Sequence, residues 1–62
     1  MKVGNEFVGK VVYVRLRVGG SYTGTILSTG STVTLLMHDN RKVMVQSSMI
    51  ASMQLMGDVK NE

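Results

Sequence analysis

The chain contains no cysteine, proline or tryptophan, and it has only one histidine and four acidic residues among its 62 positions. Without cysteine, disulfide bonds and thiolate metal sites are excluded. The histidine and the few carboxylates are too sparse to build a metal cage, so we expect no metal ion and no cofactor. The absence of proline leaves every strand edge free to donate its backbone N–H groups.

Residues for catalysis are scarce as well. Acid–base catalysis needs titratable groups held in position, but Glu6, Asp58 and Glu62 lie near the ends of the chain. Asp39 lies in a predicted turn beside His38, which we expect to be an ordinary surface residue. We therefore expect no enzyme activity and no small-molecule substrate.

Long apolar runs are also missing. No segment approaches the length of a membrane span, and residues 1–6 lack the apolar stretch of a secretion signal. We expect no membrane association and a cytoplasmic location.

The length predicts one small domain over 1–62, with a core over about 7–56 and a polar tail over 57–62. A core of this size supplies only a few kcal/mol, so small scaffolds usually need a further source of stability. Since disulfides and metal sites are excluded, we expect oligomerisation to supply it.

The charge balance is basic, with a formal net charge of +3 and an isoelectric point of about 9.7. A basic surface favours polyanions such as nucleic acid, although solubility alone explains the same balance equally well. In an assembly of several copies the charge would multiply.

Alternation of apolar and polar residues over 11–17 is typical of a half-buried strand. One face holds Val12, Val14 and Leu16, and the other holds Tyr13, Arg15 and Arg17. An aromatic ring between two cations suits a nucleic-acid surface, but a solvated strand face explains it at least as well.

Glycines punctuate the next part of the chain. Gly19 and Gly20 supply the positive φ that a tight hairpin needs. Gly24 lies inside the second predicted strand, 21–28, where glycine indicates a sharp bend or a close backbone approach. Gly30 lies in the uncharged loop 29–31.

Three further strands are predicted over 32–37, 41–46 and 49–56, with a two-residue turn at Asp39 and Asn40 and a polar break over 46–48. Gly57 is expected to end the last strand. A helical turn over 6–8, capped by Asn5 and stopped by Gly9, is expected to place Phe7 on the core. Five short strands predict a small, strongly bent, five-stranded antiparallel barrel in the all-β class.

Methionines gather in the last two predicted strands. They are Met44, Met49, Met53 and Met56. Because methionine fills irregular gaps and suits adaptable surfaces, core packing is the favoured interpretation and a subunit interface the second.

The spacing of these residues resembles the Sm-like family, which includes the eukaryotic Sm and Lsm proteins and bacterial Hfq. The first family motif corresponds to Val12, Val14, Leu16, Gly19, Gly24 and Ile26, followed by Leu35 and Met37, and Ile50 fits the second motif. The resemblance covers 7–55. It implies a strongly bent, five-stranded antiparallel SH3-like barrel behind a short N-terminal helix. It also implies a ring of six or seven copies, in which the fourth strand of one copy pairs with the fifth of the next.

The family usually binds single-stranded RNA, but this chain departs from the family pattern at the RNA-contacting positions. Gly30 replaces an aspartate, Thr32 stands at the base-stacking position, and Thr34 replaces an asparagine. The arginine and glycine of the second motif fall on Gln46 and Ser47. In the Hfq register, a lysine and a histidine fall on Ser47 and Ser48.

The resemblance and the charge together predict an Sm-like ring that binds single-stranded RNA mainly through basic charge. Tyr13, Arg15 and Arg17 would form one surface. A divergent pore-side site would comprise Gly30, Ser31, Thr32, Thr34, Gln46, Ser47 and Ser48, although capping and turn formation explain these residues as well. The alternatives are a protein-interaction ring without RNA binding and a monomeric SH3-like barrel that binds DNA.

Overall fold

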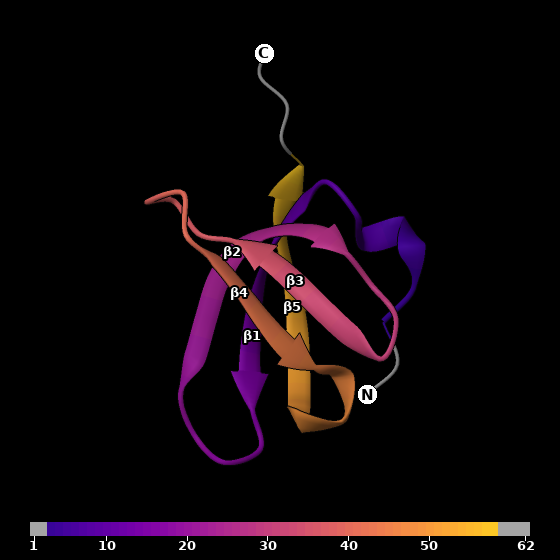
Figure 1. The fold of residues 1–62 in the computed structure, drawn as a ribbon, viewed down its shortest axis with the longest axis vertical. Helices are drawn as coiled ribbons and strands as arrows, with labels where there is room; N and C mark the ends of the chain where they lie inside the picture. The colour runs from indigo at the N-terminus through magenta and orange to yellow at the C-terminus, as the bar shows by residue number, and fades with distance from the viewer. Residues whose placement is uncertain (1–2, 59–62) are drawn as a thin grey trace.

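The computed structural model of the protein describes residues 3–58. Five antiparallel strands form one sheet in the order β4-β3-β2-β1-β5 (Figure 1). The strands are β1 (Lys10–Leu16), β2 (Ser21–Ser28), β3 (Thr32–Leu36), β4 (Lys42–Gln46) and β5 (Ile50–Asp58), and two short 3-10 turns are η1 (Asn5–Phe7) and η2 (Ser47–Met49). The predicted all-β class and its five antiparallel strands are therefore confirmed. Among the described residues, no helix is long and apolar enough to cross a membrane.

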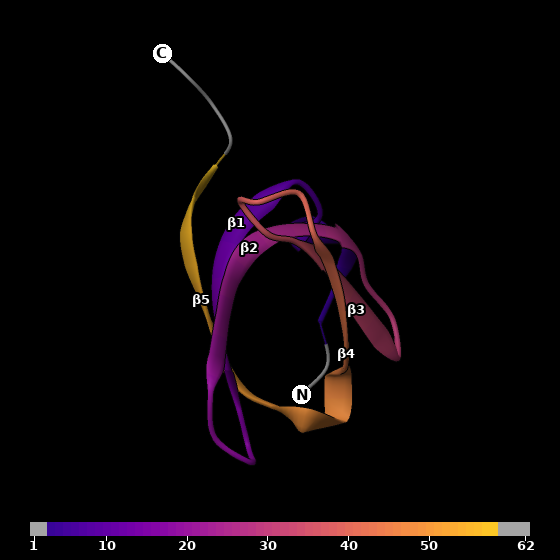
Figure 2. The same ribbon diagram turned by 60° about the vertical axis from the view of Figure 1, so that its left-hand side comes forward.

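The sheet curls around a single apolar core (Figure 2). Val12 and Val14 of β1 are fully buried, whereas Arg15 on the opposite face of β1 is exposed. This confirms the predicted alternation. The buried apolar side chains are Val3, Val12, Val14, Ile26, Val33, Leu35, Val45 and Ile50. Val3 is 4% exposed, so the core begins earlier than the predicted residue 7.

Gly24 is the position at which β2 bends from one partner strand to the next. Thr25 pairs with Val11 on β1 and also with Leu36 on β3. A Cβ atom on Gly24 would lie 2.8 Å from the Leu36 carbonyl oxygen and 3.2 Å from the Met37 sulfur. Only glycine permits this approach, as predicted from its place inside a strand.

The two hairpins β1–β2 and β3–β4 close on three-residue loops of the same kind. In the first, Gly19 N–H donates to the Leu16 carbonyl (3.1 Å) and Leu16 N–H to the Gly20 carbonyl (3.1 Å). In the second, Asn40 N–H donates to the Met37 carbonyl (2.9 Å) and Met37 N–H to the Arg41 carbonyl (2.8 Å). The predicted two-residue turn at 39–40 is therefore wrong.

Positive φ angles complete both loops. Gly19 has φ +106° and Gly20 has φ +89°, as their place in the sequence predicted, and Asn40 has φ +70°. A three-residue loop of this kind combines a four-residue turn with one left-handed residue, for which glycine and asparagine are suited.

Strand ends differ from the predicted ones by one or two residues. β1 ends at Leu16, so Arg17 belongs to the hairpin loop rather than to the strand. Gln46 is the last residue of β4, and the predicted polar break is the turn η2. Gly57 lies inside β5, where it pairs with Val11, instead of ending the strand. The remaining predicted tail, 59–62, lies outside the described residues.

The N-terminal turn is η1, one residue earlier than predicted and without the predicted cap. Gly4 occupies the N-cap position, and no side chain caps the turn. The Asn5 carboxamide instead accepts a hydrogen bond from the Thr29 hydroxyl (2.6 Å), which ties η1 to the β2–β3 loop. Phe7 packs against the core, as predicted.

The edge strands β4 and β5 carry exposed apolar side chains. Met44 on β4 is 71% exposed, and Leu55 and Met56 on β5 are 51% and 56% exposed. Met49 and Met53 pack against the core, so the core interpretation is confirmed for these two methionines and wrong for Met44 and Met56.

Candidate nucleic-acid interface

The loop between β2 and β3 lies against η2. The Ser47 backbone N–H donates to the Ser31 carbonyl at 2.9 Å, and the Ser47 hydroxyl donates to the Gly30 carbonyl. Ser47 is 9% exposed, so its role is to hold the two loops together. We call this polar site the loop cluster, and it comprises Gly30, Ser31, Thr32, Gln46, Ser47 and Ser48.

Neighbouring strand ends supply the rest of the loop cluster. Thr32, the first residue of β3, pairs directly with Gln46, the last residue of β4. The Gln46 side chain is exposed and that of Thr32 is partly buried. Thr34 pairs with Met44 further along the same strands, so the structure places Thr34 outside the loop cluster.

Arg17 belongs with the loop cluster, although its predicted neighbours were Tyr13 and Arg15. Its backbone N–H donates to the Met49 carbonyl (2.9 Å), and its Nε donates to the Ser48 carbonyl (3.0 Å). The hairpin loop after β1 thereby holds the Arg17 guanidinium against η2. A cation held in this way adds a fixed positive charge beside six uncharged residues of the loop cluster.

Tyr13 and Arg15 lie on the outer face of β1. Tyr13 pairs with Thr23 on β2 and with Gln54 on β5, and Arg15 pairs with Ser21 and Ser52. Directly opposed residues share one face of a sheet. We call this surface the β1 outer face, and it comprises Tyr13, Arg15, Ser21, Thr23, Ser52 and Gln54. Arg15 is exposed at one end of it, among hydroxyl and amide groups.

Carboxylates whose side chains are described lie away from these surfaces. Glu6 lies in η1 and Asp39 in the β3–β4 hairpin, whereas η2 and the β1–β2 hairpin lie at the lower end of the molecule in Figure 1. The Arg41 backbone N–H (3.2 Å) and Nε (2.9 Å) both donate to the Asp39 carboxylate. These contacts, the backbone hydrogen bond first, lower the pKa of Asp39 below its usual 3.8.

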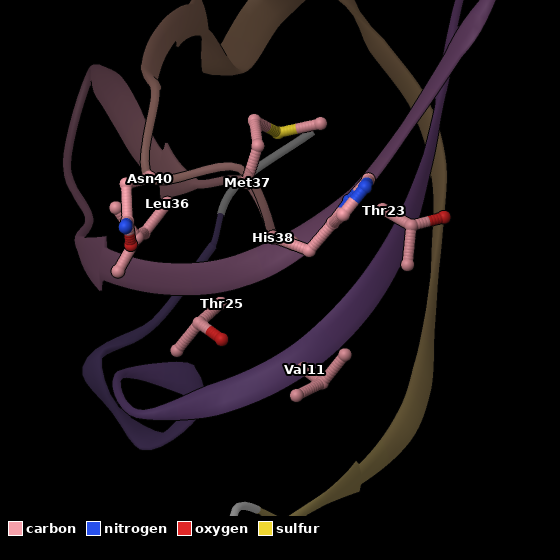
Figure 3. A pocket seen from close by; sticks show the side chains of 8 residues that line it. Val11, Thr23, Thr25, Leu36, Met37, His38 and Asn40 are labelled. Atoms are coloured by element: carbon pink, nitrogen blue, oxygen red, sulfur yellow. The ribbon is translucent and has the colours of Figure 1, made fainter.

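A groove lies beside the bend of β2, under the β3–β4 hairpin (Figure 3). Its volume is about 350 Å³. It is lined by Val11, Thr23, Gly24, Thr25, Leu36, Met37, His38 and Asn40. Sequence reasoning missed this groove because its lining comes from three separate segments. Gly24 was predicted as a bend, Asn40 as part of a turn and His38 as a surface residue.

Within residues 3–58 there is no group of three histidine, cysteine or acidic side chains that could hold a metal ion. Comparison with protein families, curated proteins and solved structures gives no significant match for this chain. The resemblance to the Sm-like family therefore stays a prediction from the spacing of residues.

Proposed function

We propose that this protein forms a homo-oligomeric ring that binds single-stranded RNA. The observation that carries the proposal is the contact between Arg17 and η2, which adds a cation to the uncharged loop cluster. A guanidinium suits phosphate oxygens, and hydroxyl, amide and backbone groups suit the edges of unpaired bases. The end of the molecule that carries Arg17 thus combines the two kinds of group that an RNA strand needs.

Binding by this site is expected to depend on charge more than on base identity. An aromatic side chain stacked on a base contributes roughly 1–3 kcal/mol, but Thr32 and Gln46 offer no ring or guanidinium to sandwich one. Arg15, on the β1 outer face beside Tyr13, adds a second cation for the strand. Phosphate contacts therefore dominate the proposed affinity, and they make it sensitive to salt.

The two edge strands of the sheet support the proposed ring. β4 and β5 each pair with only one strand among the described residues, and each carries exposed apolar side chains. Unpaired edges are liabilities that proteins cover. Pairing β4 of one copy with β5 of the next would cover both edges, and head-to-tail contacts of this type close into a ring when the rotation permits. Six or seven copies, a cytoplasmic location and the absence of catalysis belong to the same proposal.

The test is the salt dependence of binding to fluorescent oligo-U and oligo-A, measured by anisotropy. Each phosphate contact to a single strand contributes about 0.7 to the slope of log affinity against log salt. Replacing both Arg15 and Arg17 by alanine is expected to lower the slope by roughly 1.4, since two such contacts are lost.

Arg41→Ala is the matched control, because it removes an arginine whose guanidinium is already bonded to Asp39. It should leave the slope nearly unchanged. Failure of the unmodified protein to bind either oligonucleotide at low salt would contradict RNA binding.

A protein-interaction ring is the second candidate, favoured by Gly30, Thr32 and Gln46 at positions where the resembling family places RNA-contacting residues. Native mass spectrometry before and after ribonuclease separates the two. A ring with nucleotide mass that ribonuclease removes supports RNA binding, and a ring without it supports the second candidate. A monomer would contradict both, and would favour an SH3-like DNA-binding barrel.

A further inference from the structure

The fold divides the methionines of residues 3–58 into two groups. Met37, Met49 and Met53 are partly buried and pack against the core. Met44 and Met56 are each more than half exposed. The exposed pair lies on β4 and β5, which are the two edge strands of the sheet (Figure 1). Solvent and small reagents therefore reach the edge methionines more easily than the core methionines.

The Met44 side chain points away from the core. Met44 is the middle residue of β4, and Thr34 lies directly opposite it on β3. Val43 packs against the core and Val45 is part of it, so the alternation of the strand places Met44 on the outer face. A β-branched residue suits a strand better than an unbranched one. Strand propensity therefore does not explain a methionine at this position.

Met56 lies where β5 departs from regular pairing with β1. Leu55 pairs with Val12 and Gly57 pairs with Val11, which are adjacent residues of β1. Met56 is thus the extra residue of a bulge, and bulges at sheet edges redirect side chains. The second exposed thioether lies on the edge of the sheet opposite to β4.

We propose that Met44 and Met56 are sites of reversible oxidation by a peroxide, and that the sulfoxide form opposes pairing of β4 with β5 of another copy. The effect on pairing rests on the ring proposed above. Hydrogen peroxide is the oxidant, and methionine sulfoxide reductases restore the thioether.

The oxidation step needs no group of the protein other than the thioether. The sulfur lone pair attacks one oxygen of hydrogen peroxide, so that an S–O bond forms and the O–O bond breaks. The proton of the attacked oxygen passes to the departing hydroxide, which leaves as water. Sulfur is oxidised by two electrons, and the peroxide is reduced by the same two.

Oxidation at the edge strands changes the surface and spares the core. A sulfoxide on Met44 or Met56 lies in solvent as long as the copy is free, because both side chains are exposed. A sulfoxide on Met49 or Met53 would instead place a polar group against the apolar core, which carries a large cost. The folded protein therefore tolerates oxidation at the two edge positions.

Pairing of β4 with β5 of another copy changes the surroundings of both edge methionines. Side chains on neighbouring paired strands lie beside one another, and a thioether adapts well to an apolar contact of this kind. A sulfoxide brings a strong hydrogen-bond acceptor into the contact, and burying it without a donor is unfavourable. We expect oxidised copies to assemble about tenfold more weakly, and assembled copies to be oxidised more slowly than free ones.

The first measurement compares the oxidation rates of the methionines within one peptide. Met44, Met49, Met53 and Met56 lie in a stretch with no lysine or arginine between residues 43 and 59, so trypsin leaves them together and fragmentation in a mass spectrometer separates them. In dilute folded protein treated briefly with hydrogen peroxide, we expect Met44 and Met56 to gain oxygen several-fold faster than the other two. The difference should vanish in denaturant, and equal rates in the folded protein would overturn the proposal.

The second measurement is native mass spectrometry before peroxide, after peroxide and after treatment with the reductases. The double variant Met44→Leu, Met56→Leu keeps apolar side chains of similar volume, and its assembly should resist peroxide. Met53→Leu is the matched control and should stay sensitive. Met44→Gln introduces a polar side chain in place of the thioether, and it should weaken assembly without any peroxide.

The outcomes separate this inference from the proposed function. A ring that persists after Met44 and Met56 have been oxidised would overturn the inference and leave the ring in place. A ring that peroxide dissolves equally in the double leucine variant would overturn it as well. A monomer before any peroxide would contradict the ring and, with it, this inference. The oligo-U salt slope tests RNA binding independently.

Discussion

The two hairpins of this protein have the same backbone and opposite side-chain behaviour. Each closes on three residues with the same pair of hydrogen bonds, and each has an arginine at or beside its loop. Arg17 of the first reaches η2, thirty-one residues away in sequence, whereas Arg41 of the second bonds to Asp39, two residues away. One hairpin therefore links distant parts of the sheet, and the other neutralises its own charge.

This difference indicates that loop geometry alone does not assign a role to a hairpin. The first loop, which uses glycine for its positive φ, presents a cation to the loop cluster. The second uses asparagine, which keeps a carboxamide at the mouth of a groove that has no cation in its lining. The first hairpin therefore places a positive charge beside polar groups, and the second lies beside a groove whose lining is uncharged.

The largest expected effect comes from Gly24→Ala, because β2 joins the two hairpins through its bend. The added Cβ would meet the Leu36 carbonyl oxygen at 2.8 Å, and that oxygen belongs to the backbone and has little freedom to move. Overpacking of this kind costs about 1–3 kcal/mol. Urea unfolding measures the loss.

Gly4→Ala is the matched control for Gly24→Ala. There the Cβ would meet only the carboxylate end of Glu6, which is a flexible, exposed side chain. Equal destabilisation by the two substitutions would show that the close approach at Gly24 is not what matters.

Alanine at the positive-φ residues compares the two loops directly. Gly19→Ala is expected to cost about 1–2 kcal/mol, since alanine strains the φ of +106° at this position. Asn40→Ala should cost less, because asparagine already carries a Cβ at φ +70°, and Asn40→Gly should be nearly neutral. Thermal unfolding of the three variants checks this order, and a larger loss for Asn40→Ala than for Gly19→Ala would mean that backbone strain does not decide the cost.

The two arginines give a smaller contrast in stability. Arg17→Ala removes a hydrogen bond to the Ser48 carbonyl that joins two distant segments, and a bond of this kind contributes about 1 kcal/mol. Arg41→Ala removes only an exposed local ion pair and should cost less. Chemical denaturation of both variants at high and low salt measures the two losses of stability. A larger loss of stability for Arg41→Ala than for Arg17→Ala would contradict the expected order.

The smallest expected effect is a pH dependence confined to the second hairpin. The folded pKa of Asp39 lies below the usual 3.8, so the unfolded chain binds a proton more readily. Asp39 therefore stabilises the fold above its unfolded pKa, and this contribution is lost as the pH falls through the folded value. Asp39→Asn should remove that acid-side loss, as seen in urea midpoints at neutral and acidic pH. An unchanged pH profile would exclude Asp39 as its source.

Elements governed by local rules could be predicted from the sequence. The alternation over 11–17 identified the buried Val12 and Val14, and the residues of β2 agree with the predicted range. Strand ends were less accurate because pairing decides them. β5 continues through Gly57 and Asp58 since Val11 and Lys10 lie opposite to pair with them.

Contacts between distant segments could not be predicted. The sequence grouped Arg17 with Arg15 because they alternate, but the turn after Leu16 redirects Arg17 to η2. Asn5 was predicted to cap the N-terminal turn, but its side chain instead accepts a hydrogen bond from the Thr29 hydroxyl. The groove combines β1, β2 and the β3–β4 hairpin, so no single stretch of sequence carries its pattern.

The place of β1 between β2 and β5 has a consequence for the order in which the protein is made. β1 meets β2 as soon as the first hairpin leaves the ribosome, but its other edge stays open until the last strand has been synthesised. A chain that stops before Ile50 lacks that partner, and its core loses a fully buried side chain. In such a nascent chain the unpaired edge of β1 can pair with strands of other chains, so rapid synthesis of β5 protects β1 from aggregation.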